Sequence, residues 1–225
     1  MYKAIKRAFD ILASILGLVV TSPIWIVAII GIEISDPGPL FYVATRVTKD
    51  NKEFKMFKFR SMRAGKANES VFRGEEDRIF AFGKVIRKLK IDELPQLINI
   101  LIGNMSVVGP RPAAIDQMDI TRSGKYAIAA KAKAGLTCPS AIYDYIHGDS
   151  ILNEEEYMND VLPVRLALEP WYIKHMGIGL DIKMIWWTIK AIVMSIFGTS
   201  SDKMYEKLVS WANEEGLEKV SREIH

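Results

Sequence analysis

The apolar positions of the chain are concentrated in one long run near the N-terminus. From Ile11 to Ile32 there is no charged residue. As an α-helix this run would be roughly 33 Å long, about the thickness of the hydrocarbon core of a bilayer. It is too long for a typical signal-peptide core and lacks a convincing cleavage site. We therefore expect residues 1–35 to form a retained membrane element; a signal peptide and a buried soluble helix are the alternatives.

Pro23 lies near the middle of this run, directly after Thr21 and Ser22. Proline removes a backbone donor and clashes with the preceding helical turn. A hydroxyl side chain often satisfies the carbonyl that a proline leaves free, and Ser22 or Thr21 can supply one. Ser22 and Pro23 therefore form the predicted break in the membrane helix.

After residue 35 the pattern changes to short segments typical of a compact domain. The segments LFYVATRV and KEFKMFKFR flank a polar TKDN, which predicts a β-hairpin over residues 40–60. Apolar residues at i, i+3, i+4 and i+7 from Leu94 predict a short amphipathic helix that ends at Gly103. The segment SVVGPRP reads as a buried strand or turn that leads into a rigid loop.

The remaining segments carry weaker patterns. Runs of charge, of glycine or of small apolar residues separate them. We expect a loop or short helix over 64–80, a helix over 113–131, an ordered loop over 134–149, and the start of another helix in the acidic stretch 153–160.

A second apolar stripe lies near the C-terminus, where Lys183 and Lys190 interrupt it. Tryptophan favours the headgroup region, so the stripe favours an amphipathic helix lying in the membrane interface. A core helix of the domain is the alternative. The stripe consists of Ile182, Ile185, Trp186, Ile189, Val193 and Ile196.

These patterns together predict a mostly helical α/β (α+β) fold in three parts. Residues 1–35 are the basic lead-in and membrane element. Residues 36–199 are a compact domain with a small β-hairpin and interfacial amphipathic helices. Residues 200–225 are a polar helical tail without a chemical signal.

Composition narrows the classes of function. A formal net charge of +3 over 225 residues gives no global sign of a nucleic-acid binder. The basic residues are clustered, however: Lys3, Lys6 and Arg7 precede the apolar run and share a helix face suited to anionic headgroups. Cys138 is the single cysteine, which excludes an intrachain disulfide and, with three histidines, argues against zinc. Magnesium held by carboxylates and phosphates stays open.

Two adjacent carboxylates are the main candidates for chemistry. Asp92 and Glu93 stand at the predicted start of the helix that carries Pro95 in its first turn. The unpaired amides and dipole of a helix N-terminus keep carboxylates ionised there. An ordinary N-cap explains the pair equally well.

Basic residues surround this pair in the sequence. Arg87, Lys88 and Lys90 lie just upstream, and Arg111 is held between two prolines in GPRP. An arginine on so stiff a loop loses little entropy when it grips a phosphate through two donors. The plain alternative for Arg111 is an exposed loop arginine.

Several motifs of the chain occur in the same order in a known family. They are KRAFD before the apolar run, TSP within it, KFRSM, the long block DELPQLINILIGNMSVVGPRP, and AGLT. On these motifs the chain resembles the small monotopic phosphoglycosyl transferases, bacterial sugar transferases that begin lipid-linked glycan assembly. The likeness covers roughly residues 3–190, and the DELPQL to GPRP block is its most specific part.

The resemblance implies a reaction and a role for each matching residue. A UDP-sugar donates its sugar phosphate to undecaprenyl phosphate, which gives a diphosphate-linked lipid and UMP. Asp92 would be the nucleophile that forms a covalent phosphosugar intermediate, and Glu93, together with Asp92, would hold a Mg²⁺ ion. The expected phosphate contacts are Arg87 and Arg111, with Lys58 and Arg60 adding to a basic floor.

One segment departs from the family pattern. Many members carry a proline before the glycine of a PGIT-like loop followed by Gly-Trp, whereas this chain has AGLT and then CPSAIYDYIHGD. The sugar therefore does not follow from the resemblance. Asp144 and His147 are weak candidates for substrate contact in this segment, and stabilising the loop itself is the alternative.

The family also bears on the arrangement in the membrane. Basic residues at the N-terminus favour a cytoplasmic start by the positive-inside rule, and nucleotide sugars and magnesium are cytosolic. We therefore expect a re-entrant helix that bends at Ser22 and Pro23 and returns to the cytoplasmic face of the bacterial cell membrane. The expected partners are membrane lipid and downstream glycosyltransferases, with no nucleic acid.

Two other classes of function compete with the transferase. One is a membrane-tethered binding module whose basic, aromatic hairpin grips RNA or anionic lipid. The other is a hydrolase that uses the acid pair on a phosphorylated or glycosidic substrate. Adjacent carboxylates argue against the glycosidase form, because its two acids must flank the bond from opposite sides.

Overall fold

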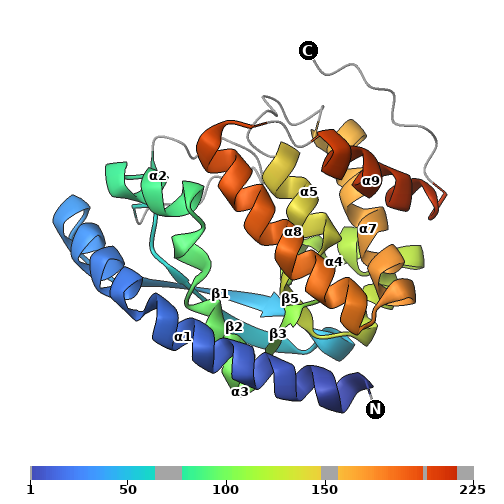
Figure 1. The fold of residues 1–225 in the computed structure, drawn as a ribbon, viewed down its shortest axis with the longest axis horizontal. Coiled ribbons are helices and arrows are strands. Elements are labelled where there is room, and N and C mark those ends of the chain that lie inside the picture. The colour runs from blue at the N-terminus through green and yellow to red at the C-terminus, as the bar shows by residue number, and fades with distance from the viewer. Residues whose placement is uncertain (1, 64–77, 148–156, 200–201, 217–225) are drawn as a thin grey trace.

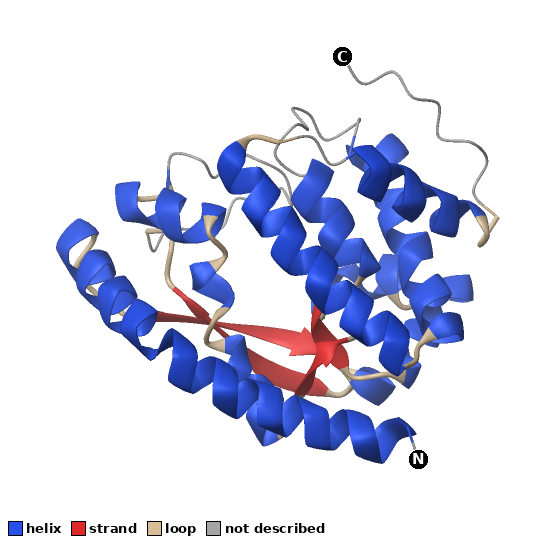
Figure 2. Cartoon of the chain, in the orientation of Figure 1, coloured by secondary structure: helices blue, strands red, loops and turns tan. Residues whose placement is uncertain are grey.

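A small β layer separates a long N-terminal helix from a group of C-terminal helices (Figures 1 and 2). The computed structural model describes residues 2–63, 78–147, 157–199 and 202–216. The helices are α1 (Tyr2–Ser35), α2 (Ala81–Lys88), α3 (Gln96–Ile102), α4 (Met118–Thr121), α5 (Pro139–His147), α7 (Leu162–His175), α8 (Ile178–Phe197) and α9 (Asp202–Asn213). The strands are β1 (Phe41–Val47), β2 (Glu53–Phe59), β3 (Met105–Val108), β4 (Ala113–Ala114) and β5 (Ala134–Thr137).

The predicted β-hairpin is confirmed. Strand β1 pairs antiparallel with β2 from Phe41 opposite Phe59 to Val47 opposite Glu53. The turn contains Asp50 and Asn51 at φ 56° and 54°, a left-handed conformation that Asp and Asn tolerate better than most residues. Strand β4 pairs with the other edge of β1.

The expectation of an ordered loop over 134–149 is wrong. Residues 134–137 form β5, which pairs parallel with β3, and Pro139 begins α5. Proline suits the first turn of a helix, because the N–H that it lacks has no intrahelical partner there. The backbone of β5 and the backbone just after β3 approach so closely that a Cβ on Gly135 would lie 2.1 Å from the nitrogen of Gly109.

The expected helix over 113–131 is also wrong. The segment instead begins with the short β4 and continues through 3₁₀ turns around the single-turn α4. Pairing of Ala113 and Ala114 with β1 fixes an extended start that no local pattern indicates. Residues 64–77 of the expected loop or short helix over 64–80 lie outside the described residues. So do residues 153–156 of the expected helix start at 153–160, and after them a π-helical turn at Tyr157–Val161 leads into α7.

Helix α1 is continuous through Pro23 and is bent rather than broken. Figure 1 shows its second half turning away from the line of its first half. Pro23 leaves the carbonyl of Val19 without its usual donor, and the Ser22 hydroxyl donates to that oxygen at 2.8 Å. The Thr21 hydroxyl donates to Gly17 O at 2.7 Å. The predicted use of a hydroxyl is therefore confirmed, while the predicted interruption of the helix is not.

Among the described residues, α1 is the one helix long and apolar enough to cross a membrane. It has 34 residues and a mean hydropathy of 2.5 over its most apolar window, of which 11% is buried within the chain. Its second half nevertheless docks tightly on the domain, since a Cβ on Gly31 would meet the ring of Phe82 at 2.4 Å. Trp25 packs edge-on against Phe59 of the hairpin, with centroids 5.0 Å apart.

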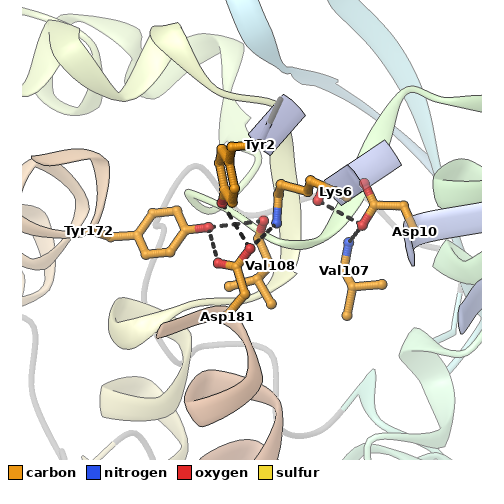
Figure 3. A network of polar contacts seen from close by, with 8 residues as sticks. Tyr2, Lys6, Asp10, Val107, Val108, Tyr172 and Asp181 are labelled. Atoms are coloured by element: carbon orange, nitrogen blue, oxygen red, sulfur yellow. Dashed lines mark hydrogen bonds and ion pairs between the residues drawn. The ribbon is translucent and has the colours of Figure 1, made fainter. Parts of the chain in front are cut away.

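The basic lead-in serves the fold rather than a free headgroup-binding face. Lys6 bonds Asp181 at 2.7 Å, and Asp181 also accepts from the hydroxyls of Tyr2 and Tyr172 (Figure 3). Arg7 donates to the carbonyls of Ile100 and Leu101 at the C-terminus of α3, where a cation complements the helix dipole. The expectation that Lys6 and Arg7 face lipid headgroups is wrong, and of the three cations only Lys3 is exposed.

Asp10 also ties α1 to the domain. Its Oδ1 accepts from the Ser106 hydroxyl and from the backbone N–H of Val107, both at 2.9 Å. Figure 3 shows Asp10 directed at Val107 while Lys6 points to Asp181. The two contacts tie the start of the apolar helix to β3 and to α8.

The C-terminal stripe lies on α8 and faces outward. Trp186 is 64% exposed and Ile182 58% exposed, whereas the opposite face buries Met184 and Ala191. The core-helix alternative for the stripe therefore fails. The following helix, α9, does enter the core, where Leu208 and Trp211 join the cluster built by α5, α7 and α8.

Asn99 holds α3 against the edge of β2. Its side chain is fully buried; Oδ1 accepts from Phe57 N at 2.9 Å, and Nδ2 donates to Lys55 O at 2.7 Å. The amide thus takes the place of a neighbouring strand.

Replacing Asn99 by alanine is expected to lower the free energy of unfolding by ~2–4 kcal/mol. The change leaves a buried N–H and a buried carbonyl unpaired, and each costs about 1–3 kcal/mol. Chemical denaturation in detergent measures the loss. Asn104→Ala, at a half-buried amide, is the matched control; an equal effect of both variants would contradict the role given to Asn99.

Candidate active site

One cleft of about 730 Å³ beside the hairpin brings the predicted site residues together. They come from β2 and the residue after it, the end of α2, a turn before α3, and the loop after β3. Eight basic side chains line this cleft against two carboxylates, which suits a polyanionic ligand. The predicted residues that line it are Lys58, Arg60, Arg87, Asp92, Glu93 and Arg111.

Asp92 and Glu93 do not open α3 as expected. They lie in a 3₁₀ turn, Ile91–Glu93, and α3 begins only at Gln96, after Pro95. Neither this turn nor α3 has a side-chain hydrogen bond at its N-cap. The ordinary N-cap explanation of the two carboxylates therefore fails.

Asp92 is a buried carboxylate with an unused oxygen. Its side chain lines the cleft with 7% of the residue exposed, and Oδ1 has no hydrogen-bond partner among the described residues. Burial raises the pKa of Asp92 from 3.8 to about 6, against the lowering effect of Lys58. A carboxylate that is neither bonded nor fully solvated is available to a ligand.

Glu93 has the opposite environment. Burial would raise its pKa, but the charges of Lys58, Lys90 and Arg111 outweigh burial and hold the pKa well below its usual range. Lys58 Nζ lies 3.0 Å from Glu93 Oε1. Glu93 is therefore a fixed anion beside the more loosely held Asp92.

Arg111 is oriented by an acidic neighbour. Its Nη1 lies 3.0 Å from Asp144 Oδ2, which also lies 3.5 Å from Arg165 Nε. Burial would lower the pKa of Arg111, but Asp144 and Glu93 raise it above its usual value. Asp144 thus positions a cleft arginine, a role that differs from both expectations for it, substrate contact and stabilisation of its own loop. His147 ends α5, and its side chain lies outside the described part of the structure.

The two remaining predicted arginines differ. Arg60 is buried, and its guanidinium bonds the side chain and carbonyl of Asp36 and the carbonyl of Pro39, in the turn after α1. Its donors therefore fix that turn, and the expectation that it binds phosphate is not supported. Arg87 contacts Met62 Sδ at 3.5 Å and is otherwise exposed to the cleft.

Lys90 also lines the cleft, although the sequence pattern indicated it only as a basic neighbour of the carboxylates and not as a phosphate contact. It lines the cleft at φ 56°, and its Nζ lies 4.3 Å from the centroid of the Tyr145 ring. Burial lowers the pKa of Lys90, partly offset by Glu93 and Asp92. Its position two residues before Asp92 is the sequence feature that could have indicated a place in the cleft. The left-handed backbone that turns it into the cleft has no signature in a lysine.

The carboxylate pair fits a magnesium ion in part. No group of three or more metal-ligating side chains occurs among the residues that the structure describes. Magnesium is commonly bound by one or two carboxylates together with substrate phosphates and water. The unpartnered Oδ1 of Asp92 and the neighbouring Glu93 meet that requirement.

Lys58→Met is expected to raise the pKa of Asp92 above its present value of about 6 and to raise that of Glu93 as well. The lysine is the largest cationic influence on both carboxylates. A ¹³C NMR titration of the aspartate and glutamate carboxyl carbons measures the change. Lys55→Met, on the exposed face of the same strand, is the control; an unchanged Asp92 titration in Lys58→Met would contradict the electrostatic account.

Comparison with known proteins agrees with these observations. Residues 1–195 match the family described as bacterial sugar transferase. A UDP-N-acetylgalactosamine-undecaprenyl-phosphate N-acetylgalactosaminephosphotransferase of Aeromonas hydrophila is 34% identical over 86% of this chain and 44% of its own length. An uncharacterized sugar transferase, EpsL, of Bacillus subtilis is 31% identical over 85% of this chain and 88% of its own.

A third relative is similar over a comparable share of the chain. An undecaprenyl-phosphate glucose phosphotransferase of Komagataeibacter xylinus is 35% identical over 84% of this chain and 36% of its own length. The chain therefore spans less than half of two of these relatives and most of the other.

Proposed function

The chain belongs to the bacterial sugar transferase family, and from that premise we propose that it transfers a sugar 1-phosphate from a UDP-sugar to undecaprenyl phosphate and releases UMP. The observation that carries the proposal is the buried carboxylate of Asp92, whose Oδ1 has no hydrogen-bond partner among the described residues, in a cleft lined by eight basic side chains. Two of the relatives are named as undecaprenyl-phosphate sugar phosphotransferases. Both proposed substrates are anions that such a cleft attracts.

In the first step an Asp92 carboxylate oxygen attacks the sugar-bearing phosphorus. A bond forms between that oxygen and phosphorus, the bond to the bridging oxygen breaks, and UMP leaves with the electron pair. This attack requires an ionised carboxylate. Because burial raises the pKa of Asp92 only to about 6, the carboxylate is largely ionised at neutral pH. Covalent catalysis of this kind splits one difficult displacement into two.

In the second step a phosphate oxygen of undecaprenyl phosphate attacks the same phosphorus and displaces Asp92. A direct attack of one polyanion on another would face strong repulsion, which the neutralising cleft and the two-step route both reduce. In this proposal the phosphates are held by four cations that line the cleft, Lys58, Lys90, Arg87 and Arg111. A Mg²⁺ ion held by Asp92 and Glu93 would neutralise the diphosphate and the leaving UMP.

The exposed apolar faces support a membrane-bound site. Helix α1 exposes apolar residues along its length, and α8 exposes the stripe that includes Trp186. We propose that α1 is re-entrant, bends at Ser22 and Pro23, and keeps the domain on the cytoplasmic face. The product would pass to glycosyltransferases that extend a lipid-linked sugar.

Cysteines introduced by Lys3→Cys and Leu40→Cys in a Cys138→Ala background are expected to label from the same side of the membrane. The two positions flank α1, so a re-entrant helix leaves both on one face, whereas a straight span separates them. Labelling of intact and inverted vesicles with an impermeant maleimide measures this. Opposite sidedness would refute the re-entrant arrangement.

UMP release tests the reaction itself. The protein is incubated with a panel of UDP-sugars, Mg²⁺ and undecaprenyl phosphate, and UMP and the lipid product are quantified. The proposal expects one UMP per lipid-linked sugar phosphate. UMP together with free sugar phosphate and no lipid product would instead indicate a hydrolase.

A further inference from the structure

A second, smaller cavity opens beside Glu93. It has a volume of about 160 Å³ and shares Lys58, Glu93 and Arg111 with the large cleft. Its far walls come from α4, β5, α5 and α7, which lie close together in Figure 1. Since a water molecule in the liquid occupies roughly 30 Å³, this cavity has room for about one six-membered ring and not for a whole nucleotide.

Gln96 lines this cavity with an unused amide. The residue is only 3% exposed, and its side chain makes no hydrogen bond to any residue in the described part of the chain. An amide so placed, with two donor hydrogens and an acceptor oxygen free, is suited to bind a ligand with several hydroxyl or amide groups.

The opposite wall is charged and rigid. Arg122 Nη1 lies 2.8 Å from Glu169 Oε2, with the two side chains 3% and 5% exposed. Arg122 Nη2 donates to Arg111 O at 2.8 Å, which links this wall to the cleft arginine. The buried Nε of Arg122 has no acceptor among the residues described. The buried ion pair therefore fixes this wall, and Gln117 and Thr121 line the cavity beside it.

The composition of the cavity favours a sugar over a nucleobase. None of the described side chains that line it is aromatic, whereas proteins commonly hold bases by stacking them on aromatic rings. The cavity adjoins Glu93 and Lys58 directly, so it receives whatever group is bonded to the phosphorus next to Asp92. In a UDP-sugar attacked at the sugar-bearing phosphorus, two groups are bonded there, the sugar and the UMP that leaves. A cavity with room for about one six-membered ring and without an aromatic lining residue among those described fits the sugar.

We propose that this cavity is the sugar subsite of the donor and that the Gln96 amide, with Gln117 and Thr121, selects the sugar through hydrogen bonds to its ring substituents. The inference rests on the proposed function and adds which part of the chain chooses the substrate. A site built to hydrogen-bond a substrate discriminates strongly against analogues that leave its buried groups unpaired.

The test compares Gln96→Leu with the unmodified protein on UDP-glucose, UDP-galactose and their two N-acetylhexosamine counterparts. We expect kcat/KM for the best donor to fall by ~100-fold and the ratio between donors to change at least ~10-fold. Inhibition by UMP, which lacks the sugar, is expected to change less than ~2-fold. Gln117→Ala, at a half-buried position, gives a second variant with less risk to folding, and Asp119→Asn, exposed on α4, is the control.

Two results would overturn the sugar subsite. One is an equal loss for all four donors with unchanged ratios in both Gln96→Leu and Gln117→Ala. The other is weakened UMP inhibition, which would place the nucleoside in the cavity. If the unmodified protein releases no UMP from any donor, the proposed reaction fails. Calorimetric binding of the same UDP-sugars and of UMP then decides the subsite by the same comparison.

Discussion

Asp92→Asn is expected to lower UMP release by ~10⁴-fold or more, the scale seen when a catalytic nucleophile is removed. The amide keeps the size of the carboxylate but cannot attack phosphorus. A quenched-flow or coupled assay of UMP with saturating donor measures the loss.

The matched control for this loss is Asp119→Asn, which makes the same change at an exposed position on α4. Its activity is expected to stay within ~2-fold of the unmodified protein. A tenth of normal activity in Asp92→Asn would exclude Asp92 as the obligatory nucleophile.

The same substitution is expected to stabilise the fold. In the unfolded chain Asp92 ionises near its ordinary pKa of 3.8, whereas burial raises the folded value to about 6. The folded state therefore holds its proton over that interval, and the stability contributed by this group is lost as pH rises through it. At pH 7.5 Asp92→Asn removes a penalty of roughly 1–3 kcal/mol. A fall in the free energy of unfolding at that pH would contradict this account of the site.

Arg122→Met is expected to lower the free energy of unfolding by ~3–5 kcal/mol, because it leaves the Glu169 carboxylate buried without its partner. The carbonyl of Arg111, which accepts from Arg122 Nη2, also loses its donor. Chemical denaturation in detergent at pH 7.5 measures the change.

Two comparisons show whether the loss comes from an uncompensated charge. The double variant Arg122→Met with Glu169→Leu should recover most of the stability, since removing a whole buried pair is often nearly neutral. Lys174→Met breaks the contact with Glu215 at 2.6 Å, in which the lysine is 53% exposed, and should cost less than ~1 kcal/mol. A double variant as unstable as Arg122→Met would contradict the account.

The sequence predicts those parts of the fold that local patterns determine. The hairpin follows from alternation and the TKDN turn, and the end of α3 from Gly103, which adopts φ 95°. The apolar helices at both ends follow from their length and spacing. These features depend on neighbours within a few residues.

The errors arise where distant partners decide the structure. Residues 113–114 are extended because β1 pairs with them, and Ala134–Thr137 is a strand because β3 lies alongside. In the sequence, Lys6 and Arg7 have the pattern of residues that bind lipid headgroups. In the folded chain Lys6 pairs with Asp181, and Arg7 donates to carbonyls of α3.

The site shows the same division. Asp92, Glu93 and Arg111 stand in one specific sequence block, and the cleft does gather them. Two features depend on geometry that spacing does not encode. Arg60 donates its hydrogen bonds to Asp36, and a left-handed backbone directs Lys90 into the cleft. Gln96 lies in the same block as Asp92, and its burial beside a separate cavity gives it a role that the block alone does not reveal.

The intact mass of the protein after incubation with a UDP-sugar and Mg²⁺, without undecaprenyl phosphate, tests the two-step account most directly. We expect an adduct heavier by one sugar phosphate, located on the peptide that contains Asp92, present in Asp119→Asn and absent in Asp92→Asn. Addition of undecaprenyl phosphate should then discharge it. A protein that forms lipid product at full rate from that donor, yet never carries the adduct under rapid quenching, would contradict the covalent mechanism.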